Sequence, residues 1–364
     1  MERTNISTGQ FFTALFVSRI SAAISLNAQY AGGGDLLDSA ASCLLALAAS
    51  GLMALPLWLA LRLGGGKSLP QLAVEGGWLG RLVPAYYLFF LVFSGGSALG
   101  MFQVFLGDTM DPDFSSSLVS AALLGVALYG ALRGLETVGR CGACVFAALV
   151  LGGGLVFGMA AVRFDPDNLE PLFYHGLGQT ARSFPLFLAR TSIFAEMAVL
   201  LPQVKGRRAL GFGGWLAGTG LFLSGLLVLV VGCLGRYAST QNFPVYVLAS
   251  LSQVRSLRRL DALFTGLWMM GLIIQLAMGL YACRVCFRTL GLGKKEPRWS
   301  LWLAAGAMLG LGLLTAGSTG LQGLTLNPNS LAWWAAGAGT LAPLLALVLG
   351  LRGKGKKPPQ KEKR

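Results

Sequence analysis

Hydrophobic stretches recur along almost the whole chain, from Phe11 to Leu351, and only short polar turns separate them. Each stretch has about the length that a helix needs to cross a bilayer, which is roughly 20 residues at a rise of about 1.5 Å per residue. The pattern therefore predicts about ten membrane-spanning helices. They cover residues 11–28, 40–63, 82–106, 118–135, 141–162, 184–201, 210–234, 260–285, 299–314 and 331–351.

The composition agrees with this pattern. Hydrophobic residues make up 54% of the chain and charged residues 12%, whereas a soluble domain carries about 25% charge. The 51 glycines are typical of membrane helices that pack closely. We predict an all-α polytopic membrane protein, in which residues 1–351 form a single helical domain and residues 352–364 form a basic cytoplasmic tail.

The positions of the charges predict an orientation. With a cytoplasmic N-terminus, most of the 29 basic residues fall on the cytoplasmic side, so the positive-inside rule places both termini in the cytoplasm. Arg255, Arg258 and Arg259 run against the rule. The basic tail either meets anionic headgroups or serves as a solubilising or stop-transfer segment. The net charge of +14 belongs to membrane-flanking segments, so we do not expect nucleic acid binding.

Ten spans divide into two sets of five, and the first span of each set contains unusual polarity. Corresponding interruptions of this kind indicate a 5+5 inverted repeat, in which broken helices 1 and 6 expose backbone groups that bind substrate near the bilayer midplane. The two halves share no convincing sequence similarity. We expect Arg190 to snorkel outward. The polar residues are Ser18, Arg19, Ser21 and Ser25 in the first span and Pro185, Arg190, Thr191, Ser192 and Glu196 in the sixth.

Five segments in register carry a resemblance to a known family. Together they resemble the endospore germination permeases, the B subunits of spore germinant receptors within the amino acid/polyamine/organocation superfamily. The segments are GLETVGR at 134–140, DPDNLEPL at 165–172, FAEMAVLLP at 194–202, FPVY at 243–246 and RLDALFTGLW at 259–268.

The resemblance implies a ten-helix LeuT-like fold in the spore inner membrane. It also implies a complex with a larger membrane A subunit and a lipoprotein C subunit, in which this chain binds a small nutrient such as an amino acid and signals germination by a conformational change. The chain departs from the family where Ser21 replaces a glycine and Arg19 replaces a neutral polar residue. An H⁺- or Na⁺-coupled amino acid transporter and a scaffold with a degenerate pocket are the alternatives.

Arg19 and Glu196 are the charged candidates for the ligand site. Each lies well inside its span and alone costs about 2.5 to 3.5 kcal/mol to insert, so pairing or a wet cavity is expected. We hypothesise that the two side chains face one another or the charged groups of a ligand, because guanidinium and carboxylate suit the two ends of an amino acid zwitterion. Alternatively, Glu196 ties helices together and Arg19 snorkels.

Smaller and aromatic residues complete the predicted ligand site. Small side chains let a ligand touch the backbone, and aromatic rings exclude water. Tight helix packing explains the small residues equally well, and the Gln275 amide could serve an interhelical hydrogen bond instead of a ligand. The predicted lining comprises Ser21, Ala22 and Ala23 from the first span, Phe194 and Ala195 from the sixth, and Trp268, Gly271 and Gln275 from the eighth.

Cysteines give a subsidiary metal hypothesis, and catalysis has little support. Cys141 with Cys144 and Cys283 with Cys286 are i, i+3 pairs that could in principle supply four thiolates to one metal. The alternative is that they are ordinary small apolar residues.

His175, the single histidine, lies in a predicted external loop. We therefore expect no enzyme activity and no cofactor.

Overall fold

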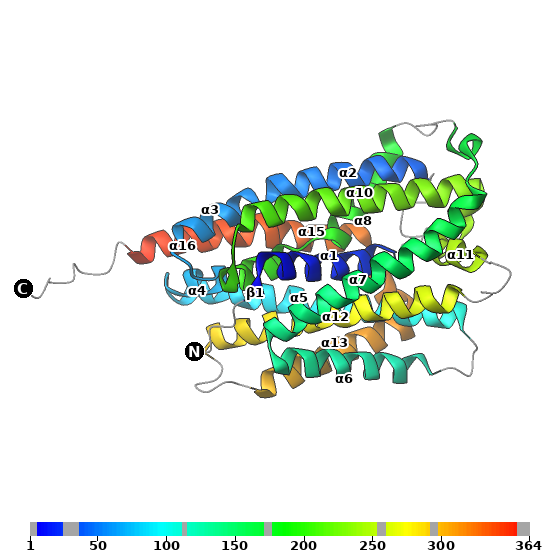
Figure 1. The fold of residues 1–364 in the computed structure, drawn as a ribbon. Helices are drawn as coiled ribbons and strands as arrows, with labels where there is room; N and C mark the ends of the chain where they lie inside the picture. The colour runs from blue at the N-terminus through cyan, green and yellow to red at the C-terminus, as the bar shows by residue number, and fades with distance from the viewer. Residues whose placement is uncertain are drawn as a thin grey trace, which may run out of the picture.

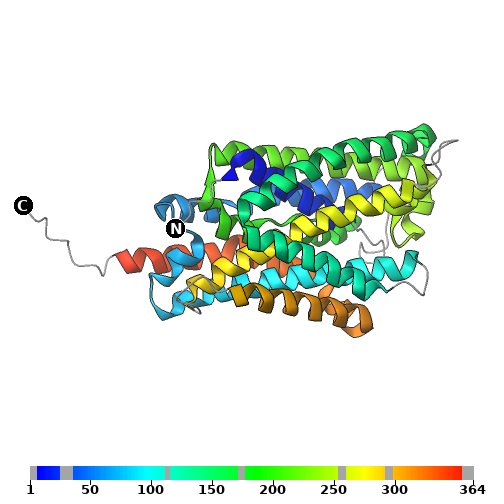
Figure 2. The same ribbon diagram turned by 60° about the horizontal axis from the view of Figure 1, so that its bottom comes forward.

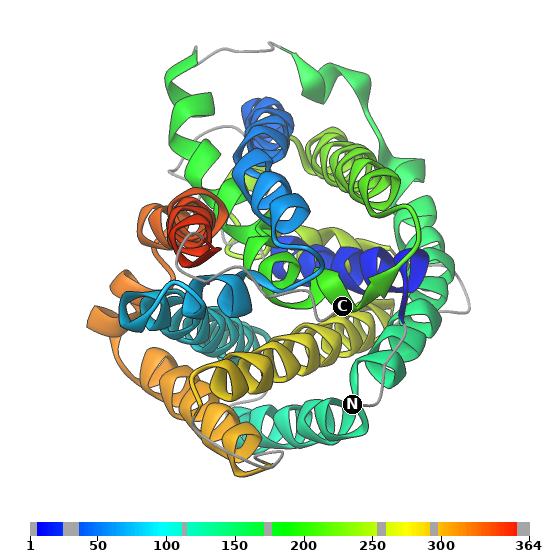
Figure 3. The same ribbon diagram turned by 90° about the vertical axis from the view of Figure 1, so that its left-hand side faces the viewer.

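A backbone that crosses a bilayer must satisfy its own hydrogen bonds, and this chain does so almost entirely with helices. The computed structural model describes residues 6–24, 36–110, 115–170, 177–252, 260–291 and 298–354. The long helices run in broadly similar directions and form one elongated bundle (Figure 1), and a view along the bundle shows them grouped side by side (Figure 3). The described residues thus form an all-α membrane architecture.

Ten α-helices lie between Thr8 and Leu234. They are α1 (Thr8–Ile24), α2 (Leu36–Met53), α3 (Leu55–Leu63), α4 (Leu69–Val74), α5 (Leu82–Thr109), α6 (Ser116–Arg133), α7 (Leu135–Ala160), α8 (Leu177–Thr191), α9 (Phe194–Leu200) and α10 (Arg208–Leu234).

Six more α-helices follow, and the last three form a long interrupted span. The helices are α11 (Pro244–Leu251), α12 (Leu260–Thr289), α13 (Arg298–Gly317), α14 (Thr319–Thr325), α15 (Pro328–Ala336) and α16 (Ala342–Lys354). A π-helical segment, η7 (Gly337–Leu341), joins α15 to α16. Because α16 continues to Lys354, the helix extends three residues into the segment predicted as the tail.

Nine helical segments within the described residues are long and apolar enough to cross a membrane. They correspond to the second to tenth predicted spans, so the chain is an integral membrane protein. The α1 helix occupies the place of the first predicted span and has 17 described residues. A count of ten spans therefore depends on α1 and remains a prediction.

The two predicted helix interruptions have different outcomes. In the sixth span, α8 ends at Thr191 and α9 begins at Phe194, so the break is present. In the first span, α1 is continuous through Ile24, and a break at Ser21–Ala23 is wrong. Serine side chains can be satisfied inside a helix, and Ser18 donates to the carbonyl of Leu15 at 2.8 Å.

Basic residues gather at one end of the bundle, the left-hand end of Figure 1. Arg62 and Arg133 lie at the ends of α3 and α6, Lys67 and Arg81 precede α4 and α5, and Arg208 begins α10. We define the basic end by these five residues. The strand β1 (Ile6–Ser7) and the C-terminal part of α16 lie toward the same end.

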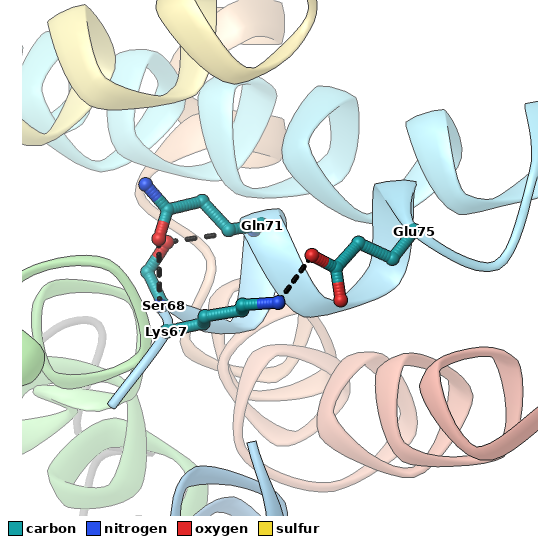
Figure 4. Close-up of polar contacts among 4 residues, drawn as sticks. All are labelled: Lys67, Ser68, Gln71 and Glu75. Atoms are coloured by element: carbon teal, nitrogen blue, oxygen red, sulfur yellow. Dashed lines mark hydrogen bonds and ion pairs between the residues drawn. The ribbon is translucent and has the colours of Figure 1, made fainter. Parts of the chain in front are cut away.

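The short helix α4 lies at the basic end (Figure 2). Ser68 caps it: its hydroxyl accepts from the backbone N–H of Gln71 at 3.4 Å, and the Gln71 side chain accepts from the N–H of Ser68 at 3.1 Å (Figure 4). Lys67 forms an exposed ion pair with Glu75 beside this capping box. Leu69, Leu72 and their neighbours are buried, so α4 packs into the bundle.

Candidate functional site

The break in the sixth span creates the local geometry of the candidate site. Thr191 Oγ1 donates to the carbonyl of Phe187 at 2.7 Å in the last turn of α8. Ile193 then leaves the helical conformation, with φ −118° and ψ 11°, and the chain re-enters a helix at Phe194. Ser192, in the interruption, is buried, and its hydroxyl has no hydrogen-bond partner among the described residues.

Glu196 is placed directly after this break and meets Arg19 from α1. Because Glu196 lies in the first turn of α9, its carboxylate also faces the favourable end of the helix dipole. Arg19 Nη2 and Glu196 Oε1 form a buried ion pair, and each residue is 4% exposed. The structure therefore brings together the two charged residues that were predicted to face one another.

The ion pair leaves hydrogen-bonding capacity unused. Within the described residues, Arg19 Nε and Glu196 Oε2 are buried without a partner, as is Oε1 of Gln275 on α12. Buried polar atoms normally find partners, because an unpartnered one costs about 1 to 3 kcal/mol. The interior therefore holds one donor and two acceptors that no described residue satisfies.

Ser21 and Gly271 join α1 to α12 by direct contact. A Cβ at Gly271 would lie 1.6 Å from Ser21 Oγ, so only glycine permits this approach. Ser21 Oγ is 3.5 Å from the carbonyl of Trp268, one helical turn earlier. Gln275 follows Gly271 by four residues and therefore lies on the same face of α12. The small residues predicted from sequence are used here for helix packing.

Trp268 belongs to a buried aromatic cluster. Its ring centroid lies 4.2 Å from that of Phe105, 5.6 Å from Phe102 and 6.4 Å from both Phe243 and Phe264. These rings come from α5, α12 and the segment before α11. The cluster adjoins the Ser21–Gly271 contact through Trp268.

The remaining predicted residues are also buried. Ala22, Ala23 and Ala195 are at most 7% exposed. The Phe194 ring packs on Gly339 of η7, where a Cβ would come within 2.7 Å of the ring. Hence the start of α9 is supported by the last span. All of the predicted site residues are described and buried, and their contact with a ligand remains a prediction.

Two details were missed or misjudged from sequence. Arg190 is only 7% exposed, so the expectation that it snorkels outward is wrong; it is enclosed by the helices around α8. Gln103 on α5 was not selected, although it is buried and its Nε2 has no partner among the described residues. An amide in an otherwise apolar span was the available signal, and its neighbour Phe102 contacts Trp268.

The first and sixth spans are also joined at the basic end. Ile6 and Ser7 of β1 pair in parallel with β2 (Val204–Lys205), which follows α9. The Thr8 hydroxyl donates to the Lys205 carbonyl at 2.9 Å. Two contacts therefore hold α1 and the second half of the sixth span together. One is the backbone pairing of β1 with β2 at the basic end, and the other is the buried Arg19–Glu196 ion pair.

The cysteine hypothesis is wrong as a four-thiolate site. Cys141 and Cys144 are exposed on α7, whereas Cys283 and Cys286 are buried on α12. No group of three or more cysteine, histidine or acidic side chains suited to a metal occurs in the described part of the chain. The two pairs face different surroundings because α7 turns its cysteine face outward. His175 lies outside the described residues.

Comparison with known proteins identifies the family of this chain. The chain matches the model of a family described as spore germination protein over residues 5–314. It is 24% identical over 205 residues to spore germination protein KB of Bacillus subtilis (strain 168), a match that covers 53% of this chain and 54% of that protein. The chain thus matches about half the length of this curated relative. The family is one of membrane proteins. This chain belongs to the spore germination protein family of membrane permeases.

Proposed function

We propose that this chain is the nutrient-binding membrane subunit of a spore germinant receptor. Membership of the spore germination protein family supports this role. The single observation that carries it is the buried Arg19–Glu196 pair at the break of the sixth span. In this proposal the chain lies in the spore inner membrane, has a LeuT-like arrangement, and assembles with an A-type membrane subunit and a C-type lipoprotein.

The ligand we propose is a small zwitterion such as an amino acid. The ligand carboxylate would replace that of Glu196 at the Arg19 guanidinium. The ligand ammonium group would donate hydrogen bonds to the Glu196 carboxylate and to the Gln275 amide oxygen. The unpartnered atoms Arg19 Nε, Glu196 Oε2 and Gln275 Oε1 support this assignment. Opening the ion pair would loosen α1 from α9, and this conformational change would be read by the A subunit.

The charge distribution supports a cytoplasmic location for the basic end. Arg62, Lys67, Arg81, Arg133 and Arg208 flank helices there, as the positive-inside rule requires of cytoplasmic segments. Because β1 and the end of α16 lie toward this end (Figure 1), we propose that both termini are cytoplasmic.

Ligand binding to purified protein in lipid nanodiscs tests the proposal. We expect one or more members of a panel of amino acids to raise the Tm, since a ligand at 100 times its Kd stabilises the folded state by about 2.7 kcal/mol. Arg19→Gln and Glu196→Gln should each abolish the shift. Arg140→Gln, which removes the exposed ion pair between Arg140 and Glu136, is the matched control and should keep it. A panel that stabilises neither wild type nor control rejects the ligand-binding role.

Ion-coupled transport is the second candidate, because a buried carboxylate with one unpartnered oxygen is suited to carry a proton. Uptake of a radiolabelled ligand into proteoliposomes separates the two functions. Accumulation that depends on a proton or sodium gradient, and that Glu196→Gln abolishes, supports transport. Saturable binding without accumulation supports the receptor role.

A further inference from the structure

An apolar groove opens on the side of the bundle between the start of α5 and the last span. Its volume is about 640 Å³, within the range of about 300 to 1,000 Å³ that is usual for small-molecule sites. Leu82 and Phe89 line one wall, and Trp333, Leu341 and Leu345 line the other. Both walls belong to segments that can cross the membrane, so the groove faces the lipid.

A hydrogen bond next to the π-helical segment lies in the wall of the groove. The Tyr86 hydroxyl donates to the backbone carbonyl of Trp334 at 2.6 Å. This bond satisfies the polar group of the tyrosine within the wall. Gly337 makes room for it, because a Cβ there would lie 2.4 Å from the same hydroxyl oxygen. The tyrosine is thereby held in the wall, with its polar atom already bonded, and the surface left for an occupant is apolar.

The dimensions of the groove favour a single hydrocarbon chain over a helix. Trp333 and Leu345 are twelve residues apart along the last span, which is about 18 Å at a helical rise. A volume of about 640 Å³ over that length corresponds to a channel roughly 7 Å across. A helix with side chains is about 10 to 12 Å across and is too wide to enter.

A positive charge lies at one mouth of the groove. Arg81 directly precedes Leu82, is exposed, and forms no ion pair with any residue in the described ranges. Trp78, three residues earlier, is 76% exposed. Exposed tryptophan and arginine side by side are typical of the headgroup level of a bilayer. A lipid phosphate at this level would be beside Arg81 while its chain enters the groove.

We propose that this groove is a binding site for an anionic phospholipid, with one acyl chain between α5 and the last span and the phosphate on Arg81. The site is separate from the Arg19–Glu196 centre. The two are adjacent through η7, where Gly337 contacts Tyr86 of the groove and Gly339 contacts Phe194 at the break in the sixth span.

Photolabelling in nanodiscs tests the proposal. The probes are phosphatidylglycerol and phosphatidylcholine that carry a photoreactive group on one acyl chain, and mass spectrometry locates the labelled peptides. We expect label on the groove-lining parts of α5 and α16, with phosphatidylglycerol favoured about fivefold by one basic residue. Ala85→Trp, which fills the groove from an exposed position, should reduce that label severalfold, and Arg81→Gln should remove the preference for phosphatidylglycerol.

Matched variants on other faces are the controls. Leu221→Trp changes an exposed position on α10, where Leu221 is 78% exposed, and Arg133→Gln removes a basic residue at the end of α6. Both should label as wild type does. Leu345→Trp fills the groove from its other wall and should repeat the effect of Ala85→Trp. Equal labelling by both lipids in wild type, or label that survives both tryptophan variants, would overturn the proposal and leave only the general lipid annulus.

Discussion

The guanidinium of Arg19 is ion-paired with the carboxylate of Glu196, although the two residues are 177 positions apart in the sequence. One comes from the middle of α1 and the other from the first turn of α9, and each is 4% exposed. A lone charge at this depth is costly, so each residue makes the other tolerable. The pair is therefore a buried charged link between two spans.

Removing one member of the pair should destabilise the protein severely. Arg19→Met leaves the Glu196 carboxylate buried without its counter-charge, a change that costs about 3 to 5 kcal/mol in comparable buried pairs. We expect a markedly lower Tm in detergent or nanodiscs. Thermal unfolding followed by fluorescence-detected size exclusion measures the change.

The double variant Arg19→Met with Glu196→Leu separates stability from ligand binding. Replacing both charges by apolar groups removes the unpaired charge, so most of the lost Tm should return, while any ligand-induced shift should remain absent. The exchange of Arg19→Glu with Glu196→Arg should likewise fold and lose ligand response. Full ligand response in the exchanged protein would assign the pair a purely structural role.

A side chain at Gly271 should disrupt the contact between α1 and α12. The Cβ of Gly271→Ala would lie 1.6 Å from Ser21 Oγ, and overpacking of this kind costs about 1 to 3 kcal/mol. We expect a lower Tm, measured as above, and partial recovery when Ser21→Gly is added. Gly266→Ala on the same helix is the control, because a Cβ at Gly266 meets nothing within 4 Å. Equal losses at both positions would contradict this account of the contact.

The cysteines should divide into reactive and protected groups. Cys141 and Cys144 are exposed, whereas Cys43, Cys283 and Cys286 are buried. We expect a maleimide to modify the first two in folded, detergent-solubilised protein and the other three only after denaturation. Peptide mass spectrometry identifies the sites. A membrane-impermeant maleimide extends the test to orientation: Cys141, which lies next to Arg140 near the start of α7, should react in inside-out vesicles and stay unmodified in intact cells.

The two polar features at the start of α4 should contribute unequally. Ser68→Ala removes a helix cap that satisfies the backbone N–H of Gln71, which typically costs about 0.5 to 2 kcal/mol. Lys67→Gln removes an exposed ion pair with Glu75, and such pairs contribute about 1 kcal/mol or less. Tm measurements should therefore show the larger loss for Ser68→Ala, and the reverse order would contradict the role of the capping box (Figure 4).

Several features could be predicted because they follow from local physical chemistry. Apolar run length located the second to tenth spans, since about 20 apolar residues have few alternatives to crossing a bilayer. The high cost of isolated charges singled out Arg19 and Glu196 as partners. Pro185, Thr191 and Ser192 marked the sixth span as irregular, and a break occurs at Ser192. Motifs in register identified the family.

Other features required the tertiary structure. The polarity of Ser18 and Ser21 resembled a helix break. A hydroxyl can instead donate to a backbone carbonyl of its own helix or of another helix, and sequence alone does not say which. The two Cys-x-x-Cys pairs had similar spacing, yet one is exposed on α7 and the other buried on α12. Burial of Arg190 depended likewise on its neighbours.

By itself the sequence determined that the chain is a membrane helix bundle, which spans it contains and which charges need partners, because each of these depends on the free energy of transferring nearby residues into a bilayer. Only the tertiary structure decided that Arg19 meets Glu196, that Ser21 fills the space above Gly271, and that a groove opens beside η7. Those relationships depend on how helices far apart in the sequence are rotated and packed against one another. The pattern of apolar residues does not determine that rotation, because the lipid-facing and protein-facing sides of a membrane helix are both apolar.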